Sequence, residues 1–257
     1  MEFRILGPLE VQVVRRVQGD FPPRLATLLS GLLLNANRIV LTEELIDQVW
    51  GDAMPAKPMV ALQMAVSRLR RMLRCETSGG ARIITRQSAY LLSVEPDRLD
   101  LASFDRLVRQ ARLAAADDPE AAVMLYRQGL GYWRGPALAD VSLGSAWRAM
   151  ARRLDERRLR ALHDRIELDM SLNRHSGLVP ELTSLTGVYP FDERMYHHLM
   201  IALYATGRRA EALQTYGKAR SVLVSDLGIE PGEKLRTLQR IILSNEHATI
   251  RAHQLIE

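Results

Sequence analysis

The stretch that decides the fold lies at residues 58–74 and reads PMVALQMAVSRLRRMLR. Leu62, Val66, Leu69 and Leu73 are spaced by four, three and four residues, the interval that places side chains on one face of an α-helix. At about 100° per residue, Gln63, Ser67 and the arginines fall on other faces. We therefore expect an amphipathic helix that buries an aliphatic stripe and turns a polar, cationic face outward.

Positive charge is concentrated around this helix. Between Asp52 and Glu76 the sequence has no acidic residue and five basic ones, so this window alone carries a formal charge of +5, equal to the net charge of the chain. The basic residues are Lys57, Arg68, Arg70, Arg71 and Arg74. Exposed guanidinium groups can bind phosphates or pair with guanine, and glutamine can pair with adenine. Arginine-rich helix ends are also common on solvated surfaces, so charge alone leaves DNA binding and an ordinary surface both open.

The elements around this helix predict a winged helix-turn-helix. The residues before 96 mix strand and helix patterns, in the order strands, three helices and a hairpin, and Thr42 is a suitable N-cap for the middle helix. Arg82, Thr85, Arg86 and Gln87 would place further cations and donors beside the basic helix, as a DNA-contacting wing would. The expected strands lie at 2–6 and 9–14, and strands at 82–86 and 89–94 form a hairpin. Between them we expect one helix in the segment that Pro22-Pro23 opens and that runs to Leu34, and a second that Thr42 caps and Gly51 stops. A third helix follows a loop containing Pro55 and Pro58 and runs to about Arg74.

The chain after Pro96-Asp97 reads as helix almost throughout. Gly207, Ala212, Tyr216 and Ala219 stand at offsets that recur ninety residues earlier in Asp117, Ala122, Tyr126 and Gly129, and more weakly thirty-four residues earlier in Asn173, Leu178, Leu182 and Leu185. Thirty-four residues is the tetratricopeptide period. We therefore expect a mainly α protein: an N-terminal winged helix-turn-helix (α+β) over residues 1–96, then an all-α tetratricopeptide-like helical domain over residues 97–257.

Composition narrows the function classes. The chain has 257 residues, 47% hydrophobic and 25% charged, which fits a soluble protein with real cores. Its single cysteine, Cys75, excludes an intrachain disulfide, and neither a signal peptide nor a membrane span is evident. Glycine-rich phosphate loops and His-Glu-x-x-His motifs are absent, and the six histidines form no metal-like group. We expect a cytoplasmic, nucleoid-associated protein that is not an enzyme and has no cofactor or metal.

A protein-interaction adaptor is the alternative function. In that case the helical array would do the work, and aromatic residues would line a peptide groove, although aromatics at helical spacing more often lie in cores. The aromatic residues concerned are Tyr126, Trp133, Trp147, Tyr189 and Tyr216.

The chain resembles the Streptomyces antibiotic regulatory proteins, which join an OmpR-type winged helix to a bacterial transcriptional activation domain. The resemblance covers nearly the whole chain and lies in ordered blocks, each weak alone. These blocks are Leu6-Gly7-Pro8-Leu9-Glu10-Val11, Asn35-Ala36-Asn37-Arg38, Val49-Trp50-Gly51, Leu62-Gln63 with Val66-Ser67-Arg68-Leu69-Arg70-Arg71-Met72-Leu73, Trp133-Arg134-Gly135-Pro136-Ala137-Leu138, Val179-Pro180-Glu181-Leu182 and Leu227-Gly228-Ile229-Glu230-Pro231-Gly232.

The resemblance implies a transcriptional activator that binds direct repeats in double-stranded DNA, as a side-by-side dimer. It also implies contact with RNA polymerase holoenzyme and control of antibiotic or other secondary-metabolite genes. The DNA-contacting residues it implies are Gln63, Ser67, Arg70 and Arg71 in the groove, Arg24, Lys57, Arg68 and Arg74 on phosphates, and Arg86 on the wing.

The sequence departs from the family pattern at three places in the DNA-binding part. Ala26 stands where a second arginine is common, Met59-Val60 where Arg-Asn is common, and Ala89 where a glycine precedes the wing tyrosine. Larger members append an ATPase module, and we expect this chain, which ends at Glu257, to be a short, stand-alone member.

Overall fold

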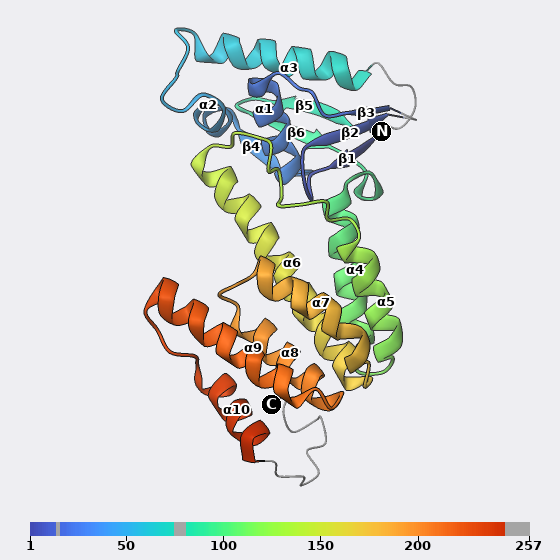
Figure 1. The fold of residues 1–257 in the computed structure, drawn as a ribbon. Coiled ribbons are helices and arrows are strands. Elements are labelled where there is room, and N and C mark those ends of the chain that lie inside the picture. The colour runs from blue at the N-terminus through green and yellow to red at the C-terminus, as the bar shows by residue number, and fades with distance from the viewer. Residues whose placement is uncertain (14–15, 75–80, 245–257) are drawn as a thin grey trace. The chain divides into compact units, whose positions relative to one another are not determined.

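A computed structural model describes residues 1–13, 16–74 and 81–244 (Figure 1). Cys75 and the last residue of the strand expected at 9–14 lie outside the described residues. The chain divides into two compact units, each considered by itself below. Unit 1 comprises Met1–Arg112 and Leu125–Ala161, and unit 2 comprises Leu113–Met124 and the residues from Leu162 onward.

Unit 1 begins with a small antiparallel sheet. Its strands β1 (Glu2–Arg4), β2 (Glu10–Val13) and β3 (Arg16–Gln18) pair in chain order. The first two strands were expected, and the three-residue β3 is too short to give a pattern of its own. Gly7, in the turn between β1 and β2, has φ of 147°, and a Cβ there would lie 2.9 Å from the Cβ of Arg134. The turn therefore requires glycine both for its backbone angle and for the close approach.

The three expected helices follow as α1 (Pro23–Leu34), α2 (Thr42–Trp50) and α3 (Pro58–Arg74). The hairpin is formed by β5 (Arg82–Arg86) and β6 (Ala89–Ser93). A further strand, β4 (Ile39–Leu41), pairs antiparallel with β6, so that the second sheet has the order β4-β6-β5.

Strand β4 changes the start of α2 from what the sequence predicts. Leu41 ends the strand and is also the N-cap of the helix, with no side-chain cap hydrogen bond. Thr42 is the first helical residue, and its N–H donates to the backbone oxygen of Ser88 at 3.0 Å. The prediction of Thr42 as N-cap was wrong because Leu41, in the extended conformation of strand β4, occupies the cap position and the helix begins at Thr42 itself.

The helix α6 (Ser145–Ser171) packs its first turns against the winged helix. Its Trp147 is fully buried, and a Cβ added to Gly31 of α1 would lie only 2.2 Å from the Trp147 ring. The N–H groups of Ala146 and Trp147 both donate to Oε1 of Gln48, at 3.0 and 3.3 Å. Gln48, in α2, therefore supplies the acceptor that the orphan donors at the start of α6 need.

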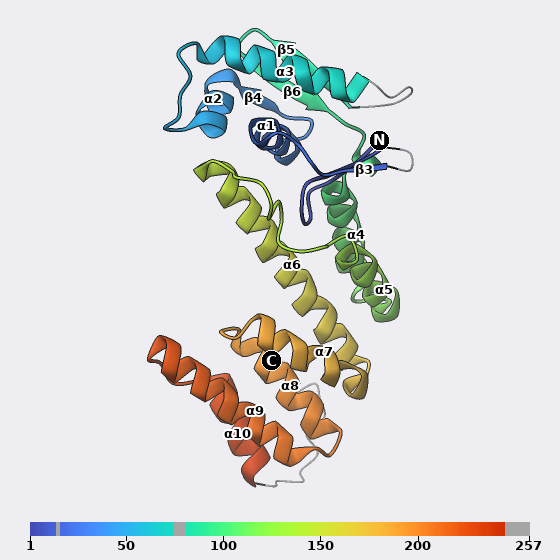
Figure 2. The same ribbon diagram turned by 45° about the horizontal axis from the view of Figure 1, so that its top comes forward.

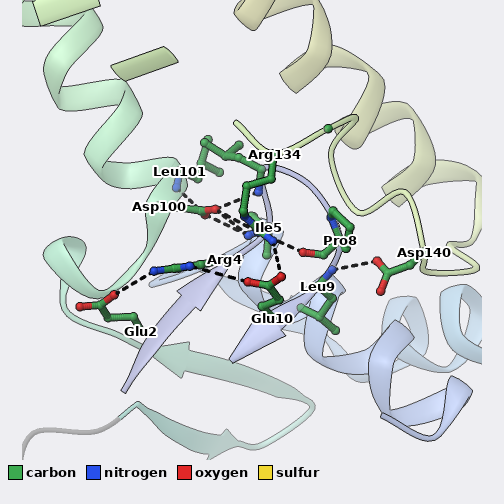
Figure 3. Close-up of polar contacts among 12 residues, drawn as sticks. Glu2, Arg4, Ile5, Pro8, Leu9, Glu10, Asp100, Leu101, Arg134 and Asp140 are labelled. Atoms are coloured by element: carbon green, nitrogen blue, oxygen red, sulfur yellow. Dashed lines mark hydrogen bonds and ion pairs between the residues drawn. The ribbon is translucent and has the colours of Figure 1, made fainter. Parts of the chain in front are cut away.

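A buried carboxylate joins the first sheet to α4 (Asp100–Ala114), as Figure 3 shows. Asp100 accepts hydrogen bonds from the N–H groups of Ile5, Leu6 and Leu101 at 2.7–3.0 Å. Burial raises the pKa of Asp100, although these three N–H groups and the charge of Arg134 oppose the rise. The chain reaches this point through η1 (Pro96–Arg98), and Leu99 forms a parallel β-bridge with Phe3.

In unit 2, consecutive helices pack on one another, as in a tetratricopeptide-like domain: α7 (His175–Val188) contacts α8 (Glu193–Ala205), and α8 contacts α9 (Arg209–Val222). Asn173 and Gly207, thirty-four residues apart, both have positive φ, of 58° and 77°, and each precedes the first helix of a pair. Ala212 and Tyr216 of the repeated pattern are buried. The expected fold class is thus confirmed. The helices are α5 (Pro119–Leu130), α7 (His175–Val188), α8 (Glu193–Ala205), α9 (Arg209–Val222), η2 (Leu223–Leu227) and α10 (Glu233–Ser244).

Candidate nucleic-acid interface

Helix α3 has the two faces that its sequence predicts. Leu62, Val66, Leu69 and Leu73 are 0–7% exposed and form its inner face. The helix begins with Pro58, whose fixed φ suits the first turn, and the backbone oxygen of the preceding Lys57 accepts from Ala61 N–H at 3.0 Å. The predicted contact residues Gln63, Ser67, Arg68 and Arg71 are all exposed on α3.

The cations of this surface are not neutralised by neighbouring carboxylates. Within the described residues, Lys57, Arg68, Arg71 and Arg86 have no ion pair with an acidic side chain. Arg134, by contrast, is paired: its Nη1 lies 2.8 Å from Glu10 Oε1 in the contacts of Figure 3. Unpaired guanidinium and ammonium groups keep all their hydrogen-bond donors available for an anionic ligand.

Arg70 departs from the expected arrangement. It is half-buried, and its Nε and Nη2 donate to the backbone oxygen of Ile83 at 3.1 and 2.9 Å, while Nη2 also donates to Thr85 Oγ1 at 2.6 Å. Both acceptors lie in β5, the first strand of the hairpin that runs alongside α3 in Figures 1 and 2. Nε and Nη2 of the guanidinium that was expected in the groove are therefore engaged in holding the wing against the helix.

The other predicted contact residues lie at the ends of α3, on the hairpin and near the start of α1. Lys57 is exposed directly before the helix, and Arg86 is exposed where β5 enters the hairpin turn. Arg24, near the start of α1, is exposed, and its Nη1 donates to the backbone oxygen of Val49 in α2. Arg74 is the last residue of α3, and its side chain lies outside the described part of the structure.

The sequence interpretation missed an apolar part of the exposed face of α3. Met59, Val60 and Met64 are 49%, 47% and 55% exposed. The helical spacing that identified the buried stripe could have identified them too, because Val60 and Met64 lie four residues apart on the opposite side of the helix.

The described residues give little support to the alternatives. Tyr126, Trp133, Trp147 and Tyr216 are at most 8% exposed and belong to cores, and Tyr189 is half-buried. They therefore do not form an open groove for a peptide. No helix in the described ranges is both long and apolar enough to cross a membrane, and no three of their His, Cys, Asp and Glu side chains are grouped to hold a metal ion.

Two described histidines of unit 2, His163 and His198, serve capping and packing. His163 Nε2 lies 2.8 Å from Oδ2 of Asp192, whose other oxygen accepts from Arg194 and Met195 N–H as the N-cap of α8. Burial opposes ionisation of Asp192, but the hydrogen bond and charge of His163 and the two N–H groups hold the pKa of this carboxyl below its usual value. His198 is 3% exposed, and burial lowers its pKa to about 3, so it is neutral at physiological pH.

Two known families match consecutive parts of the chain. Residues 18–90 match the family described as "Transcriptional regulatory protein, C terminal", and residues 99–243 match "Bacterial transcriptional activator domain". The first match contains α3 and its wing.

Characterised relatives match over nearly the whole chain. The regulatory protein DnrI of Streptomyces peucetius is 35% identical over 250 residues, which are 95% of this chain and 92% of DnrI. The transcriptional regulator RedD of Streptomyces coelicolor is 34% identical over 96% of this chain and 71% of RedD. The regulatory protein AfsR of Streptomyces griseus is 34% identical over 98% of this chain but only 25% of AfsR.

A solved structure shows the same architecture. The structure of Mycobacterium tuberculosis EmbR in complex with a low-affinity phosphopeptide superposes with a TM-score of 0.88 at 28% identity, covering 98% of this chain and 67% of that one. These relatives are regulatory proteins and transcriptional regulators. The chain belongs to the Streptomyces antibiotic regulatory protein family and is a DNA-binding transcriptional activator.

Proposed function

We propose that the chain activates a pathway for an antibiotic or another secondary metabolite by binding direct repeats upstream of its promoters as a side-by-side dimer and contacting RNA polymerase holoenzyme. In this proposal residues 1–96 bind DNA, and residues 97–257 form the activation domain. The observation that carries the DNA-binding part is the exposed face of α3, on which Arg68 and Arg71 have no carboxylate partner among the described residues.

Each predicted contact has a role in this proposal. Gln63, Ser67 and Arg71 enter the major groove, because they lie on the exposed side of α3. The expected phosphate contacts are Arg24, Lys57, Arg68, Arg74 and, on the wing, Arg86. Arg70 acts through the wing, which it holds by the hydrogen bonds to β5.

An asymmetric module favours repeats in the same orientation. A protomer that places one helix and one wing on the duplex has no two-fold axis of its own, and two such protomers can dock head to tail on tandem sites. The family resemblance supports the same arrangement, together with the polymerase contact.

Salt dependence and footprinting test the proposal. Five phosphate contacts per protomer predict that log K falls with log salt concentration with a slope of about −4 to −5 per protomer on B-form DNA. Footprinting of upstream fragments should show two adjacent protected segments in the same orientation, and purified holoenzyme should transcribe the downstream gene only when the protein is added. A single inverted repeat would refute side-by-side binding, and transcription that is unchanged by the protein would refute activation.

A further inference from the structure

The outermost stripe of α3 is apolar at one end and basic at the other. At about 100° per residue, Val60, Met64, Ser67 and Arg71 lie within roughly 60° of one another, opposite the buried stripe. Val60 and Met64 are 47% and 55% exposed. The first two turns of the helix therefore present aliphatic side chains at the position where a recognition helix contacts base edges.

Only one kind of base edge suits such side chains. In the major groove, the bases present hydrogen-bond donors and acceptors, and thymine alone adds an apolar group, its C5 methyl. Val60 has no hydrogen-bonding side-chain group, and the thioether sulfur of Met64 is only a weak acceptor, so neither side chain is suited to the polar edges of the other bases. Contact with thymine methyls would also remove their exposed apolar surface from water.

The surroundings of the apolar pair favour DNA over a protein partner. Lys57 precedes it by three residues, and Arg68 and Arg71 follow it on the same helix, all exposed and unpaired among the described residues. Cations therefore flank the apolar pair on both sides along the chain. Their positive charge complements the phosphates that line a DNA groove.

We propose that Val60 and Met64 read thymines through their C5 methyl groups and so determine part of the sequence specificity of this chain. The proposal rests on the proposed docking of α3 in the major groove. A rise of 1.5 Å per residue puts Val60 and Met64 about 6 Å apart along the helix, and Arg71 about 10 Å beyond Met64. The thymines should therefore occupy one end of each repeat, about three base pairs from the position of Arg71, with the same polarity in every copy.

Replacing thymine by deoxyuridine tests this directly, because deoxyuridine lacks only the methyl group. The bound repeat would first be obtained by selection from random duplexes with the full chain. Each thymine in one repeat would then be replaced singly by deoxyuridine, and binding measured by fluorescence anisotropy at fixed salt. We expect one or two positions at which the replacement weakens binding about threefold to fivefold, the value of one buried methyl group.

The variants Val60→Ala and Met64→Ala complete the test. Both residues are exposed on α3, so alanine should leave folding unchanged, and each variant should bind a thymine repeat more weakly while losing its sensitivity to deoxyuridine at one position. Met124→Ala is the matched control, because this methionine is 64% exposed on α5 and belongs to unit 2, whereas α3 belongs to unit 1.

Three outcomes would overturn the inference. Binding could be insensitive to deoxyuridine throughout the repeat, or Met64→Ala could keep the full sensitivity of the wild type. The variants could also bind a single repeat normally and lose affinity only on paired repeats, which would make the patch a contact between protomers. If Arg71→Ala still loses affinity in any of these cases, the proposed function stands and the thymine inference alone fails. If Arg71→Ala also binds normally, both fail.

Discussion

Arg70 and Arg71 are adjacent in the sequence, and the structure predicts opposite consequences for their replacement. Arg70 donates three hydrogen bonds to β5, at 2.6–3.1 Å, whereas Arg71 is exposed without a carboxylate partner among the described residues. Arg70→Ala should therefore lower stability and loosen the wing, while Arg71→Ala should lower DNA affinity and leave stability unchanged.

The magnitude for Arg70 follows from its contacts. Hydrogen bonds from a charged donor contribute about 1.5–3 kcal/mol when they are buried, and the half-exposed position of Arg70 reduces this value. We expect Arg70→Ala to lower the free energy of unfolding by about 1–2 kcal/mol, a fall in Tm of about 3–6 °C for a chain of this size. Arg71→Ala should change stability by less than about 0.5 kcal/mol, as is usual for surface substitutions.

Thermal unfolding followed by circular dichroism and anisotropy on the selected repeat measure the two effects. Arg71→Ala should weaken specific binding by about 1–3 kcal/mol if its guanidinium contacts a base. Arg70→Ala should weaken cognate and unrelated duplexes by similar factors, because it acts through the wing. Thr85→Val is the control, since it removes one acceptor and should reproduce part of the loss of stability. The reasoning fails if Arg70→Ala is as stable as the wild type and loses specific affinity as Arg71→Ala does.

Three further predictions concern buried packing and hydrogen bonds that stabilise the two units. Gly31→Ala should destabilise unit 1 by about 1–3 kcal/mol, because the new methyl meets the buried Trp147 ring; a normal Tm would contradict the packing. Asp100→Asn should lower stability by about 1–3 kcal/mol for each buried N–H left without an acceptor, measured by urea unfolding. Asp192→Asn keeps a cap residue but loses the carboxylate. Since the pKa of Asp192 is lowered on folding, its contribution is present above pH 4 and is lost as pH falls through the folded pKa. The stability difference from the wild type should therefore shrink on acidification, and a constant difference would refute the pairing with His163.

The elements of the winged helix could be predicted because each carries a local pattern. The four inner residues of α3 are spaced for one helix face, and all four are buried. Gly51 ends α2 with φ of 48°, a backbone angle that glycine adopts readily. The same spacing that places Gln63 and Ser67 on the opposite side of α3 makes them exposed. Local periodicity was sufficient for these features.

The features that the sequence did not reveal depend on distant partners. Strand β4 has only three residues and exists because Ile39 and Leu41 pair with β6, fifty residues later. The wing contact of Arg70 depends on acceptors thirteen and fifteen residues away. A run of arginines in the sequence does not show which of them forms hydrogen bonds within the protein, because the acceptors come from segments that only the fold brings close.

The region around residue 96, where the composition of the chain changes, is firmly held in unit 1. Leu99 pairs with Phe3, and the next residue, Asp100, accepts from the backbone N–H groups of Ile5 and Leu6. The two parts cannot easily rotate against each other at this point, because rotation would break these charge-assisted hydrogen bonds and leave the carboxylate of Asp100 buried without donors. The first turns of α6 are held as well, by Gln48 of α2. The helix proposed to read DNA and the first helices of the activation domain therefore belong to one compact body, so that docking of α3 on a repeat fixes the orientation in which α4 and the start of α6 are presented.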